Sequence, residues 1–122
     1  MITIDEFKKI GEKYGLKHRM FDIGSDVFFT KETHYLELKE NHGKCIAACS
    51  VYSDGRTDNY RVISPKMIEY TDKGVSFNSN VEINELWNMV ANREGLERCI
   101  LEDLRRIKEV KKEYRKKIVE RL

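Results

Sequence analysis

The sequence predicts a single α+β domain, in which a short N-terminal helix precedes an antiparallel β-sheet meander and two C-terminal helices, the last of them long. Three observations predict this class: apolar residues at helical spacing near the start, short β-branched and aromatic runs between glycine turns in the middle, and a helical apolar stripe over the last third. We expect a helix over residues 1–16, the sheet over 17–78 and a helical region over 79–122. With 122 residues, 40% hydrophobic and 36% charged, the chain can bury one moderate core and lacks the composition of a disordered protein.

The N-terminal helix is predicted from a capping box and a glycine stop. The hydroxyl of Thr3 can accept from the amide of Glu6 while the Glu6 carboxylate reaches back, which satisfies two amides that a helix start leaves unpaired. Three apolar residues then fall at helical spacing, and Gly15 can end the helix.

The sheet is predicted from its turns. Glycine turns recur at GSD, NHG, SDG and TDKG, and turns this short join antiparallel neighbours, because a parallel crossover needs a dozen or more residues. The segment KCIAACSVYS is apolar on both faces, which predicts the middle strand. We expect strands over residues 18–23, 27–31, 34–40, 44–53, 57–64, 67–70 and 74–77.

A second capping box, Ser79 with Glu82, predicts a helix over the segment that carries the only tryptophan. Its apolar stripe includes Leu86 and Trp87, and Gly95 is expected to break the chain after it. Three asparagines four residues apart lie away from that stripe at 100° per residue. We therefore expect an exposed row of amides formed by Asn84, Asn88 and Asn92.

The last helix is predicted over residues 96–121, with one apolar face that also contains Asp103. A helix of this size is about 39 Å long, whereas a globule of this chain length has a radius of gyration of only ~14 Å. We expect the helix to extend past its own sheet and to bury its end against another copy, most simply in a symmetric homodimer.

The sequence also bears on the compartment. No charged segment followed by an apolar run opens the chain, and no apolar run approaches the ~20 residues that span a bilayer, so we expect neither a signal peptide nor a membrane partner. Three cysteines without the spacing of a disulfide framework suit a reducing compartment. We expect the cytoplasm, which is the host cytoplasm if a phage encodes the protein.

Metal and catalytic sites are not expected. On a strand, Cys45 and Cys49 would stand about 13 Å apart, which is too far to share an ion with Zn–S bonds of ~2.3 Å, even with His42 nearby. Glu37 and Glu40 fall on opposite strand faces, and the three histidines lie outside any recognisable nucleophile motif. GxGxxG and Walker patterns are absent. The sequence therefore predicts no metal, no cofactor and no enzymatic activity.

The helical region instead offers binding chemistry. Amides can pair with base edges, and guanidinium forks hold phosphates bidentately. A solvated face remains the alternative for the asparagine row. Residues 97–122 contain ten basic and six acidic side chains, and the recurring acids weaken any phosphate-tracking stripe, so we do not expect nucleic acid as the partner.

Two stretches, IDEFKKIGEKYGLK and NELWNMVANREGLERCI, together with the layout of the whole chain, resemble the first-described family of phage Thoeris anti-defence proteins, in its clostridial branch. The resemblance implies a non-enzymatic sponge, which binds cyclic ADP-ribose isomers made by TIR-domain defence proteins and leaves them intact. Bacterial antiphage immunity is then starved of its signal. It also implies homodimers that associate into hexamers, with nucleotide pockets at subunit contacts. Some members also bind cyclic oligonucleotides.

The candidate ligand contacts are chosen by their chemistry. They are Arg56, Arg105 and Arg106 for phosphates, Asn88 and Asn92 for ribose or base edges, and Phe77 for stacking. Two alternatives stay open. One is a small phage or prophage inhibitor that binds a macromolecular target such as a CRISPR effector, and the other is a small DNA-binding regulator, although no clear helix-turn-helix is present.

Overall fold

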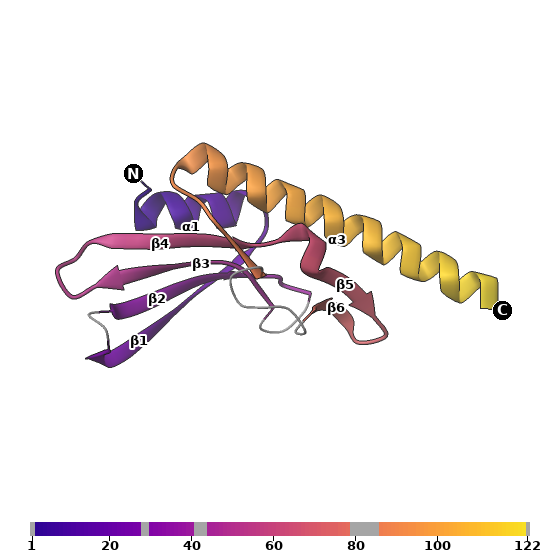
Figure 1. Ribbon diagram of the computed structural model, residues 1–122, viewed down its shortest axis with the longest axis horizontal. Coiled ribbons are helices and arrows are strands. Elements are labelled where there is room, and N and C mark those ends of the chain that lie inside the picture. The colour runs from indigo at the N-terminus through magenta and orange to yellow at the C-terminus, as the bar shows by residue number, and fades with distance from the viewer. Residues whose placement is uncertain (1, 28–29, 41–43, 79–85, 122) are drawn as a thin grey trace.

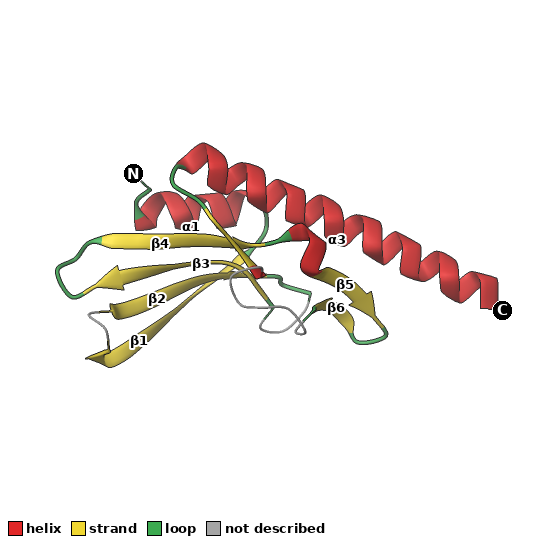
Figure 2. Ribbon diagram, viewed as in Figure 1, coloured by secondary structure: helices red, strands yellow, loops and turns green. Residues whose placement is uncertain are grey.

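The computed structural model describes residues 2–27, 30–40, 44–78 and 86–121, and consists of a sheet with two helices on one face (Figures 1 and 2). The main sheet has the strand order β1-β2-β3-β4-β7, and β5 and β6 form a separate antiparallel hairpin. The α+β prediction is confirmed. The helices are α1 (Ile4–Lys13) and α3 (Arg93–Arg121); the strands are β1 (Lys17–Val27), β2 (Thr30–Glu37), β3 (Cys45–Tyr52), β4 (Thr57–Ile63), β5 (Ile68–Thr71), β6 (Gly74–Phe77) and β7 (Trp87–Met89).

Strands β1 to β4 form the predicted antiparallel meander, with β3 in the middle of the sheet. Residues Ile46, Ala47, Ala48 and Cys49 of β3 are completely buried, which confirms the prediction drawn from their unbroken apolar run. A 3-10 turn at Pro65–Met67 leads from β4 into the β5–β6 hairpin.

Helix α1 begins as predicted, because the amide of Glu6 donates to the hydroxyl of Thr3 at 3.1 Å. The buried face of α1 lies on the sheet. The ring of Phe7 stands 5.8 Å from that of Tyr60 on β4, and Gly11 leaves room for Leu36 of β2.

Helix α3 runs over the same face of the sheet and on past the β5–β6 hairpin (Figure 1). Its buried residues are Leu96, Ile100, Asp103 and Val110. The predicted extension of the helix beyond its own domain is therefore present, and its pairing with a second copy stays a prediction. Within the described segments, no helix combines the length and apolar character needed to cross a membrane.

Two details of the helical prediction are wrong. Trp87–Met89 is strand β7 rather than helix, and it pairs antiparallel with β4. The reason is tertiary: β4 would otherwise have an unpaired backbone edge, and satisfying it outweighs weak local helix propensity. The break expected at Gly95 is also absent, because α3 already begins at Arg93 and includes that glycine in its first turn. Residues 79–85, which contain the predicted cap and Asn84, lie outside the described part.

The strands predicted over 18–23 and 27–31 are also corrected. The first continues through the expected GSD turn to Val27, and the separate strands predicted over 27–31 and 34–40 are one strand, β2, over Thr30–Glu37. The pairing register shifts between Asp22 and Val27, so the glycine at position 24 belongs to an irregular stretch of strand rather than to a turn.

Candidate functional site

The six side chains predicted to contact a nucleotide do not gather in one place. Arg56 lies in the turn between β3 and β4, where its guanidinium sits 5.0 Å from the ring centre of Tyr52. Phe77 ends β6 in the separate β5–β6 hairpin, with the ammonium of Lys44 5.7 Å from its ring centre.

The two asparagines have separate environments. Asn88 is exposed in β7, opposite Val62 of β4. Asn92 caps α3: its side-chain oxygen accepts from the amide of Gly95 at 2.7 Å, and its carbonyl accepts from the amide of Leu96 at 3.0 Å. The predicted row of amides on one helix therefore does not form with these two residues.

The two arginines of α3 face different surroundings. Arg106 forms an ion pair with Glu109 at 3.7 Å and lines a groove of about 270 Å³ between α3 and β5. Arg105 is exposed on the outer side of the helix, next to Lys108 and Lys112.

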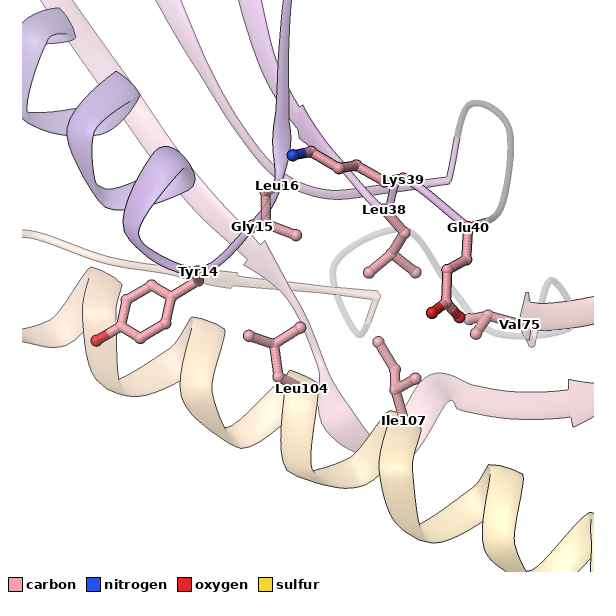
Figure 3. A pocket seen from close by; sticks show the side chains of 9 residues that line it. All are labelled: Tyr14, Gly15, Leu16, Leu38, Lys39, Glu40, Val75, Leu104 and Ile107. Carbon is pink, nitrogen blue, oxygen red and sulfur yellow. The ribbon is translucent and has the colours of Figure 1, made fainter.

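An apolar cavity of about 320 Å³ opens on the other flank of α3, and we call it the helix-side cavity. Figure 3 shows Leu16, Leu38, Leu104 and Ile107 pointing into a common space, with Val75 of β6 closing its far side. These residues come from four places in the chain: the end of α1, the end of β2, β6 and the middle of α3. A volume at the lower end of the range for ligand sites suits one or two bulky apolar side chains.

An ion pair lies at each end of this cavity. At one end, the ammonium of Lys13 lies 3.0 Å from Glu97, and the hydroxyl of Tyr14 donates to the same carboxylate at 3.4 Å. The hydrogen bond from Lys13 lowers the pKa of Glu97, so the carboxylate stays ionised at neutral pH. At the other end, Lys111 of α3 pairs with Glu40 at 3.2 Å. The cavity is thus an apolar pocket with a charged rim.

The side of α3 opposite its buried residues is positively charged. We call this side the basic outer face, and at 100° per residue it also carries the acidic side chains of Glu94 and Glu109, with Glu102 and Glu120 along one edge. Its basic residues, all exposed, are Arg98, Arg105, Lys108, Lys112 and Lys116.

The helix ends in a projecting segment, residues 111–121, which contains six basic and two acidic side chains and has net charge +4. Tyr114, near its start, still packs against Tyr70 of β5, with ring centres 5.2 Å apart. Beyond it, Ile118 and Val119 are 40% and 67% exposed. We call this segment the projecting end.

Two cysteines of the sheet and one carboxyl of α3 are buried ionisable groups. Burial raises the pKa of both Cys45 and Cys49 to about 12, which leaves their thiols protonated and inert at neutral pH. Asp103 is completely buried, and neither of its carboxylate oxygens has a hydrogen-bond partner. Burial, with the nearby charge of Glu102, raises the pKa of Asp103 to about 8, so this carboxyl is largely neutral at pH 7. It belongs to the core rather than to the cavity lining.

Sequence reasoning missed the helix-side cavity. Leu104 lies about 100° around the helix from Asp103, at the edge of the buried stripe, and a stripe this wide indicates a second packing surface. The width of the stripe could therefore have been noticed in the sequence. The cavity-lining residues near α1, β2 and β6 could not be placed beside Leu104 without the topology.

A partial similarity links this chain to Protein GrpE of Campylobacter fetus subsp. fetus (strain 82-40), at 41% identity over 71 residues. The matched part covers 55% of this chain, and the chain spans 38% of the length of that GrpE. No family model and no solved structure matches. GrpE is a nucleotide-exchange cofactor of a chaperone, which does not fit a cyclic-nucleotide sponge, so the sponge function implied by the Thoeris resemblance is corrected.

Proposed function

We propose that this chain is a non-enzymatic accessory protein that binds a partner protein along helix α3, and that the partner is a chaperone. The observation that carries the proposal is the juxtaposition of the helix-side cavity with the basic outer face on one long helix. The partial similarity to Protein GrpE supports the choice of a chaperone as partner. The unpaired cysteines support the cytoplasm as its location.

The chemistry of the surface defines what it would recognise. Leu104 and Ile107 line the cavity, while Lys108 lies on the adjoining outer face and Lys111 at the cavity rim. An acidic segment with one bulky apolar side chain could place that side chain in the cavity and its carboxylates against the lysines. Anchors of this kind, buried in a pocket and surrounded by polar contacts, dominate the affinity of protein interfaces.

The test measures nucleotide release from the chaperone that the Campylobacter fetus GrpE serves. The chaperone is loaded with a fluorescent nucleotide, and its release is followed with and without this protein. We expect faster release with the wild-type chain, and saturable binding in a parallel calorimetric titration. A chaperone that neither binds the chain nor changes its release rate would contradict the proposal.

Charge reversal tests whether the partner recognises the basic outer face itself or only the net charge of the chain. The triple variant Arg105→Glu, Lys108→Glu and Lys112→Glu should weaken binding at least tenfold, because attraction becomes repulsion at the contact. The control reverses three exposed lysines elsewhere, namely Lys9, Lys66 and Lys73, and produces the same change in net charge. Equal losses in the two variants would show that only long-range charge matters.

Filling the cavity tests the apolar half of the proposal. Leu104→Trp adds volume at the mouth of the helix-side cavity, and Leu104 is only partly buried, so the helix itself should tolerate the change. We expect loss of chaperone binding with unchanged folding by circular dichroism. Full affinity in this variant would exclude the cavity from the contact.

A further inference from the structure

Two histidines face each other on the helix-covered side of β1 and β2, outside the surfaces of α3. Nε2 of His18 lies 2.8 Å from Nδ1 of His34, and the ring centres are 5.1 Å apart. His34 is only 4% exposed, and its Nε2 lies 3.2 Å from a carboxylate oxygen of Glu32. A carboxylate, a buried imidazole and a half-buried imidazole thus form a chain that leads toward solvent.

The carboxylate sets the tautomer of the buried ring. A carboxylate oxygen accepts, so the contact with Glu32 favours the His34 tautomer that carries its proton on Nε2 and turns the Nδ1 lone pair toward His18. Metal-binding histidines show this same pattern, in which a carboxylate holds one ring nitrogen while the other binds the ion.

A third donor lies on the same face of the sheet. Met20 is the cross-strand partner of His34 and stands two residues from His18 along β1. Side chains so paired have Cβ atoms about 4.5–5.5 Å apart, within reach of a thioether. Met20 is 46% exposed and its side chain is free to turn. In the described ranges, no group of three histidines, cysteines or carboxylates could hold a metal ion, so the thioether is the third donor to consider.

We propose that His18, His34 and Met20 form a binding site for a monovalent copper ion, Cu(I). Imidazole and thioether ligands select this soft ion, whereas zinc takes four ligands in structural sites. Metal–nitrogen bonds of ~2.0 Å in a trigonal site need the two nitrogens about 3.5 Å apart. Rotation of the half-buried His18 ring supplies the difference of under an ångström.

The test is an anaerobic titration of Cu(I) in competition with a chromophoric chelator. The wild-type chain should bind one equivalent more than His18→Gln, and Met20→Leu should weaken that equivalent at least tenfold. Met89→Leu is the matched control, because Met89 is an exposed methionine on the opposite edge strand. The three cysteines are common to all four proteins, so differences in stoichiometry report the histidine site.

A second measurement uses the wild-type chain and does not depend on how the variants fold. Silver(I), a redox-stable substitute for Cu(I), should shift the ¹⁵N resonances of His18 Nε2 and His34 Nδ1 selectively. Equal copper stoichiometry in the wild type and His18→Gln, with unmoved imidazole resonances, would overturn the proposal and leave the histidines as a proton-sharing pair.

Discussion

Helix α3 is one continuous helix in two environments. As far as Val110, its inner residues are buried on the sheet and the β5–β6 hairpin, whereas beyond it Tyr114 packs against Tyr70 and the side chains that follow are exposed. Both parts are rich in charged residues, so composition does not distinguish them. They differ in whether the apolar side of the helix packs against other elements of the same chain. The first part is therefore expected to hold the fold together, while the projecting end is free to serve assembly.

The largest expected effect comes from the buried carboxyl in the first part. Asp103 has an ordinary pKa of 3.8 and a pKa of about 8 in the folded chain, so folding requires it to take up a proton throughout that interval. Its contribution to stability is fully present below pH 4 and is lost as the pH rises to about 8. Asp103→Asn removes this dependence, and should raise the free energy of unfolding by about 4 kcal/mol at pH 7 but very little at pH 4.

Urea unfolding of both proteins at pH 4, 6 and 8 measures this difference. Glu120→Gln is the control, because Glu120 is exposed near the end of the same helix and should change stability by less than about 0.5 kcal/mol. A gap between Asp103→Asn and the wild type that stays constant across this pH range would mean that the carboxyl is not protonated on folding.

Removing inner side chains compares the two parts of the helix directly. Ile100 is completely buried, and Ile100→Ala should destabilise the chain by about 3 kcal/mol, through lost apolar burial and the cavity that remains. Ile118 is 40% exposed, and Ile118→Ala should cost about 0.5 kcal/mol or less. Chemical denaturation gives both values. Similar losses would mean that the projecting end packs against something that stabilises it, such as a second copy.

The start of the helix provides a smaller effect with an internal control. Asn92→Ala removes the oxygen that accepts from the Gly95 amide, and should cost about 1 kcal/mol, the usual value of an N-cap. Asn88→Ala, in exposed β7, should stay within about 0.5 kcal/mol. Thermal unfolding measures the stability of both variants. Equal losses would mean that the Asn92 side chain does not stabilise the start of α3.

The fold was readable from the sequence wherever local chemistry agreed with tertiary structure. The capping box at Thr3, the SDG and TDKG turns and the unbroken apolar run of β3 each specify one conformation on their own. The segment around Trp87 was misread, because its helical spacing competes with the unpaired edge of β4, and only the folded sheet provides that edge.

The candidate site was much less readable. Arg105 and its basic neighbours follow from helical periodicity alone, since they lie opposite the buried stripe. The helix-side cavity and the His18–His34 pair instead depend on strand register, which joins residues 16 positions apart in the latter case. Predicting a nucleotide pocket from residue chemistry selected side chains that the topology then separated, Arg56 and Phe77 among them.

The weakest expected interaction is self-association of the projecting end, which we propose as a homodimer contact. Ile118 and Val119 offer apolar surface, but residues 111–121 carry net charge +4 and repel a second copy. Salt screens that repulsion over a Debye length of about 10 Å at 0.1 M, so the dimer fraction should rise between 0.05 and 0.5 M salt, for example. Sedimentation equilibrium measures this, and Ile118→Asp with Val119→Asp should leave a monomer of nearly unchanged stability. A dimer that survives both substitutions would place the contact elsewhere. A wild-type chain that stays monomeric at every salt concentration would show that the projecting end does not mediate self-association.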